Sequence, residues 1–380
     1  MTKARSAKGN GSVRQRENGT WEARCTINGK RRSFYGEKQS DVLRAMRAAQ
    51  KASDDGVYFE PKNITLSQWL DTWLEEYVKP SAKPLTYDTY KSRASIHIKP
   101  ALGKIKLTAL NSTQIQALYN NLSRENGLSP KTIKNLHGIL HKALDQALKL
   151  RYIAFNPADA CTLPRMEKKE IIPLTETQIA DFLAAIQNTP SKDILTVALF
   201  TGMREGEICG LPWDAVDFVN GTVTIKQQLT KNKSAGSVHY IASTKNDKIR
   251  VLTVAPFVMD ILKNVKKEQI SNNLAAGTAY QNKFNLVFTD NLGNFTNPQT
   301  LLKRFKSIAA QIGCPGARFH DLRHTYAVTA LQEGDDVKTV QQNLGHATAS
   351  FTLDVYGHVS EKMKKESAAR MQSYFEKIKA

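Results

Sequence analysis

The chain has 380 residues, of which 54 are Lys or Arg and 35 are Asp or Glu, giving a formal net charge of +19 and a pI near 9.6. This length suffices for two or three domains, each able to bury its own core. So large a positive charge favours a polyanionic partner, usually nucleic acid, although a ribosomal or merely soluble basic protein has the same balance.

The four cysteines are scattered without any C-x-x-C pair. Their spacing predicts neither a disulfide framework nor a zinc ribbon. The basic N-terminus lacks the apolar segment of a signal peptide, and no run of about 18 apolar residues occurs. We therefore expect a cytoplasmic protein, in a reducing compartment, with no membrane partner.

The first 51 residues are the most basic part of the chain, with 13 Lys and Arg against 4 Asp and Glu. Three strand-like runs follow one another, at residues 12–17, 20–27 and 30–35. The Asn18-Gly19 and Asn28-Gly29 pairs between them predict type I′ turns, because both central residues of such a turn need positive φ. Residues 38–52 have a helical pattern. The sequence thus predicts a three-stranded sheet backed by one helix.

Five arginines lie on or beside these strands: Arg14, Arg16, Arg24, Arg31 and Arg32. Because a β-ribbon fits the major groove of DNA, we predict that these side chains contact DNA. The alternative is a small basic domain whose charges are only solvated.

The next region is predicted to be helical from residue 65 to about residue 150. Four helices are expected, at residues 66–77, 83–98, 111–122 and 129–150. Ser112 and Ser129 suit N-caps, and Pro130 suits the first helical position. The stripe of Trp and Leu on the first helix is typical of a core.

Beyond a proline-rich and charged break at residues 156–169, the pattern becomes mixed α/β. Strands are expected at residues 221–228, 238–243 and 248–254, with helices before and after them. We predict three domains, at residues 1–55, 64–155 and 170–380, the last with a C-terminal helix.

In the third predicted domain, Arg204 follows a small Thr-Gly step. Glu207 comes three residues later, where a helix would place its carboxylate beside the guanidinium. A guanidinium held in this way suits bidentate binding of phosphate. An ordinary surface Arg–Glu pair has the same pattern.

Lys245 lies between two predicted strands, in a Ser-Thr-Lys-Asn-Asp-Lys segment. A lysine at a hairpin tip can donate a proton to a leaving oxygen in a cleft. Lys248 competes for this role, and a turn lysine is often only solvated.

His320 and Arg323 lie three residues apart in a predicted helix that ends near Glu333, so they share a face. His320 and His324 also have the i, i+4 spacing of some zinc sites. The segment lacks the Glu of H-E-x-x-H and an obvious third ligand, so we predict no metal site.

His346 follows Leu344-Gly345, at the predicted end of a helix for which Gly345 is the C′ residue. Tyr356 comes ten residues later. Taken singly, a buried histidine and a packed aromatic residue would explain both.

The order of these motifs is more informative than any one of them: R-x-x-E, a hairpin lysine, H-x-L-R-H, L-G-H and a tyrosine. Over residues 170–360 it resembles the tyrosine recombinase (phage integrase) family. Residues 65–150 resemble the core-binding domain of that family, and residues 1–52 resemble the arm-type DNA-binding domain of integrases from phages and conjugative transposons. One departure is the Thr-Lys-Asn-Asp-Lys segment, where many relatives have Thr-x-x-Ser.

The resemblance implies a multidomain fold: a small three-stranded β plus helix domain, an all-α core-binding domain and a mixed, mainly α catalytic domain. It also implies a site-specific recombinase that integrates or excises a mobile element without metal, ATP or other cofactor. Arg204 and Arg323 would bind the nonbridging phosphate oxygens, and Lys245 would protonate the departing 5′ oxygen. Tyr356 would form a 3′-phosphotyrosine.

The resemblance leaves His320 or His346 as the group that accepts the tyrosine proton or binds the phosphate. Its implied partners are double-stranded DNA with core-type and arm-type sites, three further copies in a homotetramer, and an accessory excisionase or DNA-bending protein. The location that it implies is the cytoplasm of a bacterial host cell, in association with the nucleoid. The C-terminal helix would cover its own core or dock on a neighbouring copy.

Two other classes of protein share these features. A type IB topoisomerase-like enzyme has the same chemistry but acts as a monomer, and the separate N-terminal domain argues against it. A non-catalytic DNA-binding protein with an inherited fold is the other, and the full set of six residues argues against that.

Overall fold

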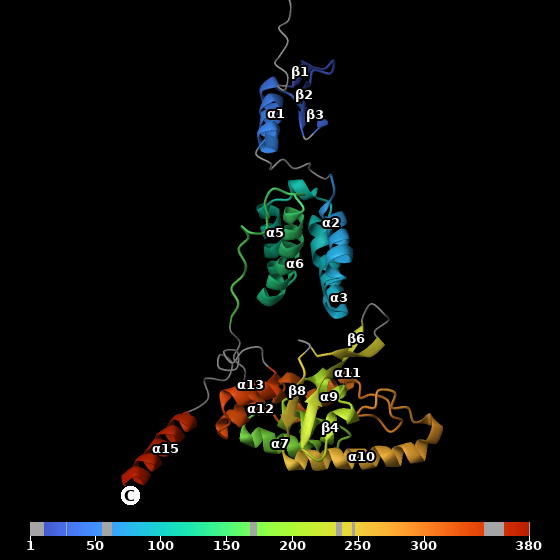
Figure 1. Cartoon of the computed structure of the whole chain (residues 1–380), viewed down its shortest axis with the longest axis vertical. Helices are drawn as coiled ribbons and strands as arrows, with labels where there is room; N and C mark the ends of the chain where they lie inside the picture. Colours follow the sequence, from blue (N-terminus) through green and yellow to red (C-terminus); the bar gives the residue numbers. More distant parts are fainter. Residues whose placement is uncertain are drawn as a thin grey trace, which may run out of the picture. The chain divides into compact units, whose positions relative to one another are not determined.

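The structure is a computed structural model that describes residues 11–27, 29–54, 63–167, 173–232, 238–244, 248–345 and 361–379 (Figure 1). The chain divides into two compact units, Met1–Glu167 and Lys168–Ala380. Each unit is described by itself below.

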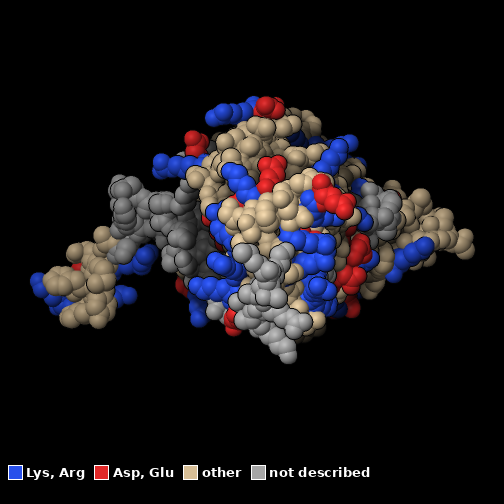
Figure 2. Space-filling view, turned by 90° about the horizontal axis from the view of Figure 1, so that it is seen from above, with Lys and Arg blue, Asp and Glu red and all other residues tan. Residues whose placement is uncertain are grey.

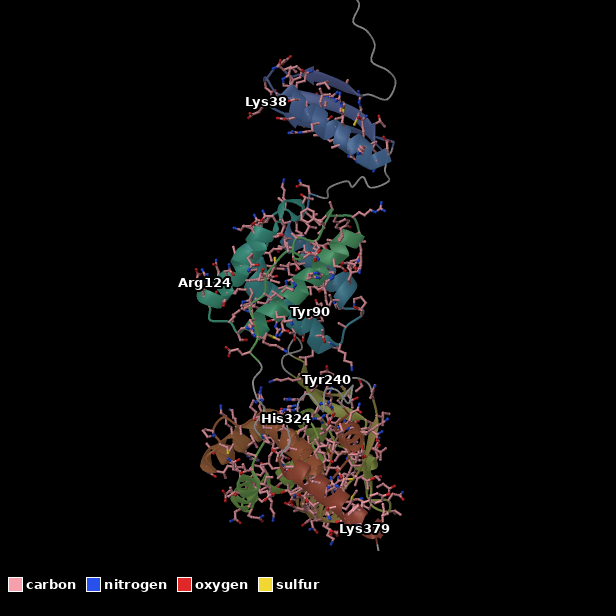
Figure 3. The ribbon with its side chains drawn as sticks, turned by 90° about the vertical axis from the view of Figure 1, so that its left-hand side faces the viewer. Lys38, Tyr90, Arg124, Tyr240, His324 and Lys379 are labelled. Atoms are coloured by element: carbon pink, nitrogen blue, oxygen red, sulfur yellow. The ribbon has the colours of Figure 1, made fainter. Side chains whose placement is uncertain are left out.

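The first unit begins with an antiparallel three-stranded sheet, in the order β1-β2-β3, and one helix. The elements are β1 (Ser12–Gln15), β2 (Trp21–Ile27), β3 (Lys30–Gly36) and α1 (Gln39–Asp54). Ala23, Cys25 and Ile27 of β2 are buried against Val42 and Met46 of α1. Figure 3 shows the helix lying along one face of the sheet. The sheet backed by one helix that the sequence predicts is confirmed.

The first turn differs from the predicted type I′ turn. The Arg16 amide donates to the Thr20 carbonyl over 2.8 Å, and the Gly19 amide donates to Arg16 over 2.9 Å, so the loop has three residues. Gly19 has a φ of 81°, but Asn18 is not among the described residues with positive φ. The Asn18 side chain instead accepts hydrogen bonds from the Thr20 amide and hydroxyl, and this local bond favours the longer loop.

The second turn connects Ile27 to its partner Lys30 through two residues. Gly29 has a φ of 74°, as a tight turn requires. Asn28 lies outside the described residues.

The rest of the first unit is helical. Its elements are α2 (Leu66–Trp73), a π-helical turn (Leu74–Val78), α3 (Pro84–Arg93), a second π-helical turn (Ala94–Ile98), α4 (Lys99–Leu102), α5 (Ser112–Arg124) and α6 (Pro130–Lys149). The predicted Trp/Leu stripe is its core. The buried Trp69 donates its indole N–H to the Ala143 carbonyl over 2.8 Å and so ties α2 to α6.

The helix starts follow from capping side chains. Ser129 accepts a hydrogen bond from the Thr132 amide, and Pro130 is the first helical residue, as predicted. For α5 the predicted cap Ser112 is wrong by one position. Asn111 is the cap because its side chain and that of Gln114 satisfy each other's backbone amides.

The second unit is mixed α/β and mainly helical, as predicted. Its helices are α7 (Glu176–Ile186), α8 (Lys192–Thr201), α9 (Glu205–Cys209), α10 (Pro256–Ala276), α11 (Pro298–Gln311), α12 (Phe319–Gln332), α13 (Val337–Leu344) and α15 (Glu361–Lys379). Its strands are β4 (Val216–Asp217), β5 (Thr222–Ile225), β6 (Gln227–Asn232), β7 (Val238–Ser243) and β8 (Arg250–Thr253).

The strands of the second unit form two small sheets, β4-β5-β8 and β6-β7. The strand predicted at residues 221–228 is therefore two strands that belong to different sheets. Between them lies Lys226, whose ammonium bonds the Asp214 carboxylate over 2.8 Å.

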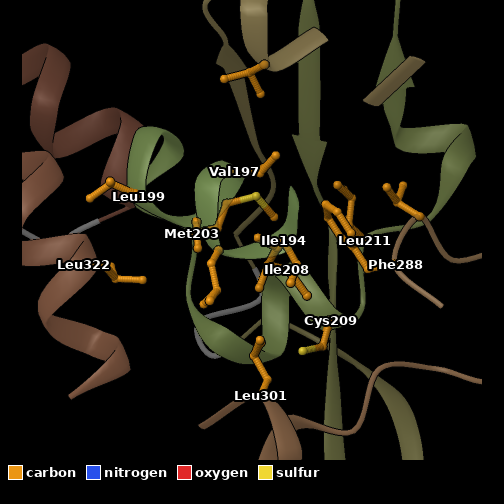
Figure 4. Packing of buried hydrophobic residues seen from close by; sticks show 14 of the residues in the cluster. Ile194, Val197, Leu199, Met203, Ile208, Cys209, Leu211, Phe288, Leu301 and Leu322 are labelled. Atoms are coloured by element: carbon orange, nitrogen blue, oxygen red, sulfur yellow. The ribbon is translucent and has the colours of Figure 1, made fainter. Parts of the chain in front are cut away.

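One apolar core joins the helices and strands around α8 and α9 (Figure 4). Ile194 and Val197 come from α8, Ile208 from α9, Leu301 from α11 and Leu322 from α12. Burying each such side chain stabilises the fold by about 1.5–3 kcal/mol. This core fixes α8, α9 and α12, and so positions Arg204, in the turn between α8 and α9, and Arg323, on α12.

Lys and Arg side chains are spread over the face seen in Figure 2, with Asp and Glu among them. None of the helices within the described ranges combines the length and the apolar composition that crossing a bilayer requires.

Candidate active site

The turn between α8 and α9 sets the position of Arg204. Helix α8 ends at Gly202, whose φ is 61°. A Cβ atom at residue 202 would lie 2.7 Å from the Tyr326 ring and 2.8 Å from the Leu344 side chain. Both the left-handed backbone and the lack of space therefore require glycine. After two residues in this turn, Arg204 is the N-cap of α9.

Glu207 holds Arg204, as the R-x-x-E spacing predicts. The Arg204 Nη1 donates to Glu207 Oε1 over 2.7 Å, and the Arg204 backbone amide donates to Oε2 over 2.9 Å. The Glu207 side chain is 1% exposed. This buried carboxylate fixes both the backbone and the guanidinium of Arg204.

A second arginine, Arg250 of β8, binds the same carboxylate. Its Nη1 lies 3.0 Å from Oε1, and its Nη2 lies 2.6 Å from Oε2. Burial alone would raise the pKa of Glu207, but the hydrogen bonds from Arg250 and the charges of Arg250 and Arg204 outweigh it and lower the pKa to about 2. Glu207 is thus ionised across the physiological range. The sequence-based prediction missed Arg250, which stands in a strand just after the Lys245 segment and was not itself part of a predicted motif.

Arg323 of α12 is the third arginine of the site and is 1% exposed. Its Nη1 donates to the Gly202 carbonyl over 2.8 Å, and its Nη2 donates to the Leu344 carbonyl at the end of α13. Since Gly202 is two residues before Arg204, this bond joins the segments that contain the two predicted phosphate-binding arginines.

The C-terminus of α13 accepts hydrogen bonds from all three arginines. Arg250 Nε donates to the Asn343 carbonyl over 2.9 Å, and Arg323 donates to the next carbonyl, as described. Arg204 Nη2 lies 3.5 Å from the carbonyl oxygen of Gly345, which is a long contact. The last carbonyls of a helix lack partners within it and form the negative end of its dipole. Three cations therefore surround the point at which the chain continues to His346.

His320 lies in the first turn of α12, one turn before His324, and their rings are 4.8 Å apart and nearly perpendicular. Partial withdrawal of the ring from water and the positive charges of Arg323 and Arg204 lower the pKa of His320. His320 nevertheless keeps much exposed surface. The pKa of the buried His324, labelled in Figure 3, is lowered to about 4, first by burial and then by His320. Both rings are therefore neutral near pH 7.

The ribbon β6–β7 packs closely on α9 through two glycines. A Cβ atom at Gly206 would lie 2.8 Å from the Leu229 carbonyl oxygen, and one at Gly210 would lie 2.4 Å from the Leu229 amide nitrogen. The backbones are thus in direct contact. Strand β7 ends at Ser243, two residues before Lys245.

Three of the six predicted catalytic residues, Lys245, His346 and Tyr356, lie outside the described residues. The structure brings the other three, Arg204, His320 and Arg323, into one region. Lys248, the competing candidate for the acid, is exposed, and its carbonyl accepts a hydrogen bond from Thr244. In the part of the chain that the structure describes, no group of three or more His, Cys, Asp or Glu side chains could hold a metal ion.

The predicted DNA-contacting arginines of the N-terminal sheet also have a buried carboxylate among them. Glu22 of β2 is 1% exposed and accepts from Arg24 Nε over 2.7 Å, Arg14 Nε over 2.8 Å and the Tyr35 hydroxyl over 3.1 Å. Hydrogen bonds from Arg24 and Arg14 lower the pKa of Glu22 to about 2, against the effect of burial. Both of these bonds use the Nε atom of the arginine.

The register of the sheet separates the five arginines. Arg14, Glu22 and Tyr35 are cross-strand partners and share the face opposite α1. Arg24 follows Glu22 by two positions on the same face, and the Arg16 guanidinium lies 5.5 Å from the centre of the Tyr35 ring. We call this surface the outer face.

The other two arginines are neighbours on β3. Arg31 pairs with Thr26, which also lies on the outer face. Arg32 pairs with Cys25, whose side chain is in the core beneath α1, so Arg32 lies on the helix side of the sheet.

The chain resembles known proteins along most of its length. Residues 173–363 match the model of the phage integrase family, and residues 65–123 match that of the phage integrase N-terminal SAM-like domain. A tyrosine recombinase XerC-like protein of Caldanaerobacter subterraneus subsp. tengcongensis is 32% identical over 374 residues, which cover 92% of this chain and 93% of that protein.

Two solved structures show the same fold. The Tn1549 transposon integrase, in complex with a circular intermediate DNA, matches with a TM-score of 0.69 and 21% identity, over 81% of this chain and 99% of that one. A lambda integrase tetramer bound to a Holliday junction matches with a TM-score of 0.58 and 18% identity, over 94% of this chain and 99% of that one. The predicted fold class is confirmed, and the chain belongs to the phage integrase family of tyrosine recombinases.

Proposed function

We propose that this chain is a site-specific DNA recombinase that integrates or excises a mobile element through a 3′-phosphotyrosine intermediate, without metal or ATP. The observation that carries the proposal is the convergence of Arg204 and Arg323, distant in sequence, on the α13 end that leads to His346 and Tyr356. Family membership supports the same conclusion.

In the proposed reaction, Arg204 and Arg323 bind the nonbridging oxygens of one phosphodiester. Negative charge grows on these oxygens as the phosphorus becomes five-coordinate, and fixed cations stabilise it. Guanidinium forks suit this role because they bind phosphate bidentately and stay protonated. They supply the charge stabilisation that a divalent metal supplies in other nucleases.

Tyr356 is the proposed nucleophile. Its phenol oxygen attacks the phosphorus, the bond to the 5′ oxygen breaks, and Lys245 or Lys248 donates a proton to that oxygen. A phenol has an ordinary pKa near 10 and needs a base or a cationic surround. His320, kept neutral by its neighbours, or His346 accepts the proton.

The second half of the reaction exchanges the DNA strands. A 5′-hydroxyl from another duplex attacks the phosphotyrosine and releases Tyr356, so the number of phosphodiester bonds is conserved and no ATP is needed. Exchange between two duplexes requires four active copies in a closed assembly. The similarity to lambda integrase, whose structure is a tetramer on a Holliday junction, supports this arrangement.

We also propose three domains with separate roles. Residues 1–55 bind arm-type DNA through the outer face, residues 64–155 bind core-type DNA, and residues 170–380 catalyse. Helix α15 exposes Met371, Tyr374, Phe375 and Ile378, and this apolar set would pack on its own domain or on a neighbouring copy. An excisionase or DNA-bending protein would set the direction of the reaction.

Tyr356→Phe tests the proposed chemistry. Incubated with nicked duplex that carries the element–host junction, the wild-type chain should form a covalent DNA adduct and the variant should form none. Both proteins should bind the duplex equally, because only one hydroxyl is lost. Adducts of normal yield from the variant would refute the role of Tyr356.

A second assay separates recombination from the topoisomerase and binding-protein alternatives. Supercoil relaxation of a plasmid without the junction sequence would indicate a topoisomerase. Binding to the junction with no adduct from the wild-type chain would indicate a non-catalytic protein.

A further inference from the structure

We propose that Arg250 is a positioning residue of the active site, which orients Arg204 through Glu207 and fixes the end of α13. The proposal rests on the proposed function, because it assigns a role in the same phosphoryl transfer. Arg250 is not one of the six residues by which the sequence resembles the family.

The first support is that every hydrogen bond of the Arg250 guanidinium is directed inward. Its Nη1 and Nη2 bind the two oxygens of Glu207, and its Nε binds the Asn343 carbonyl. The side chain is 10% exposed. Arg250 thus links β8, α9 and α13 through its guanidinium.

The second support is the way in which Glu207 divides its oxygens. Oε1 accepts from the guanidinium of Arg204 and from Arg250, while Oε2 accepts from the Arg204 backbone and from Arg250. The bidentate pair with Arg250 fixes the plane of the carboxylate. Without the pair with Arg250, each oxygen of Glu207 keeps one hydrogen bond, and both of these bonds come from Arg204. The carboxylate and Arg204 can then rotate together.

The third support is charge. Glu207 alone against Arg204 forms a neutral pair, which attracts a phosphate only weakly. With Arg250 added, the trio has a net charge of +1, and the carboxylate is shared between two guanidinium groups. Arg250 therefore preserves the positive field at Arg204 in a site where water screens little.

The fourth support is packing at the end of α13. A Cβ atom at Gly345 would lie 3.1 Å from the Arg250 Cδ and 3.3 Å from its Nη1. Arg250 thus lies against the left-handed residue, φ 65°, at which the chain leaves the helix. The contact therefore supports the left-handed backbone of Gly345, the last described residue at this end of α13.

Arg250→Met is the decisive variant, because it keeps the apolar stem and removes the fork and the charge. We would measure single-turnover cleavage at saturating enzyme on two junction duplexes, one with a phosphate and one with a neutral methylphosphonate at the cleavage position. The neutral group needs less positive charge, so defects in the arginine clamp are smaller on it.

On the phosphate duplex, Arg250→Met should slow cleavage by about 10-fold to 100-fold, below the 10²- to 10³-fold that loss of one direct oxyanion donor costs. On the methylphosphonate duplex, the ratio of the wild-type to the variant cleavage rate should be about threefold smaller than on the phosphate duplex. The dissociation constant for DNA should stay near that of wild type. Equal losses on both duplexes would mean a purely structural role and would overturn the proposal, as would an unchanged rate.

Arg304→Met is the matched control. Arg304 of α11 is an exposed arginine of the second unit that donates to the buried Ser191 hydroxyl over 3.2 Å, and not to Glu207 or to the end of α13. Any rate change in this variant should be the same on both duplexes. A smaller loss on methylphosphonate here would show that the assay reports general destabilisation, and the proposal would fail.

Arg250→Lys keeps the inference testable if Arg250→Met does not fold. Lysine retains the charge but cannot bridge Glu207 and Asn343 together. Slower cleavage with normal DNA binding is expected, and a wild-type rate would overturn the proposal. A wild-type chain that forms no adduct would instead refute the proposed function, so the two failures are distinguishable.

Discussion

Arg31 and Arg32 are adjacent on β3, yet their partners Thr26 and Cys25 place them on opposite faces of the N-terminal sheet. Arg31 lies on the outer face with Arg14 and Arg24, whereas Arg32 lies beside α1. The chain thus contains two neighbouring arginines of the same chemistry and different direction. Substitutions of these two arginines therefore distinguish an effect of direct contact with DNA from an effect of net charge.

Arg31→Ala should weaken binding to long attachment-site DNA, because a phosphate contact or base contact of the outer face is lost. The slope of log affinity against log salt should fall by about 1 for a phosphate contact. Arg32→Ala, with the same loss of charge, should leave the slope nearly unchanged. Equal effects of the two substitutions on the salt titration would contradict binding by the outer face.

Glu22→Gln should reduce the preference for the arm-type site while leaving binding to random duplex unchanged or tighter. The substitution raises the net charge by one, which favours any DNA. It also releases Arg14 and Arg24 from the carboxylate that orients them, and one well-oriented bidentate contact gives about 1–3 kcal/mol of discrimination. Competition binding between the arm-type site and random duplex measures this ratio. A ratio equal to that of wild type would show that Glu22 orients nothing.

Glu207→Gln should remove an acid-sensitive part of the stability of the second unit. The folded pKa of Glu207, about 2, is below its ordinary value of 4.5, so ionised Glu207 stabilises the fold above pH 4.5. That contribution is about 3 kcal/mol, at about 1.36 kcal/mol for each unit by which the pKa is lowered, and it is lost as the pH falls toward 2.

The measurement is the difference in unfolding free energy between wild type and Glu207→Gln. It should be largest above pH 5 and shrink toward pH 2. A difference that stays constant over this range would mean that the charge of Glu207 does not contribute.

Gly210→Ala should destabilise the second unit by about 1–3 kcal/mol and impair cleavage. Its Cβ atom would lie 2.4 Å from the Leu229 amide nitrogen, a backbone atom that can move only with β6. Displacing β6 also moves β7, after which Lys245 follows in sequence.

Gly138→Ala is the control for that change. Gly138 lies inside α6, and its Cβ atom would meet nothing within 4 Å. Alanine there should stabilise the first unit by about 0.4–1 kcal/mol. Thermal unfolding of both variants tests the pair, and a harmless Gly210→Ala would refute the close contact between α9 and β6.

Most of the fold could be predicted because its signals are local. The Ser129-Pro130 start of α6 and the left-handed Gly345 at the end of α13 each depend on residues within one helical turn. The contact between Arg204 and Glu207 is local too, since the two are three residues apart.

What the sequence did not reveal depends on contacts between distant residues. Arg250 and Glu207 are 43 positions apart in the sequence and bind each other in the fold. The alternating pattern of a strand does not indicate which charged side chain will be buried. The break near Lys226 arises because β5 and β6 join different sheets. The predicted type of the turn at Asn18 was wrong for a local reason. The Asn18 side chain accepts a hydrogen bond from the Thr20 amide, and this bond favours a different backbone geometry.

The three carbonyls at the end of α13 have a consequence for small ions. Arg323 already donates to the Leu344 and Gly202 carbonyls, so an anion that approaches this guanidinium competes with those two oxygens. Free sulfate or inorganic phosphate makes no other contact with the protein or DNA that would offset the free-energy cost of this competition. A phosphate within duplex DNA is anchored by its neighbours along the strand. The site should therefore be selective for polymeric phosphate and remain closed to the abundant free anions of a cell.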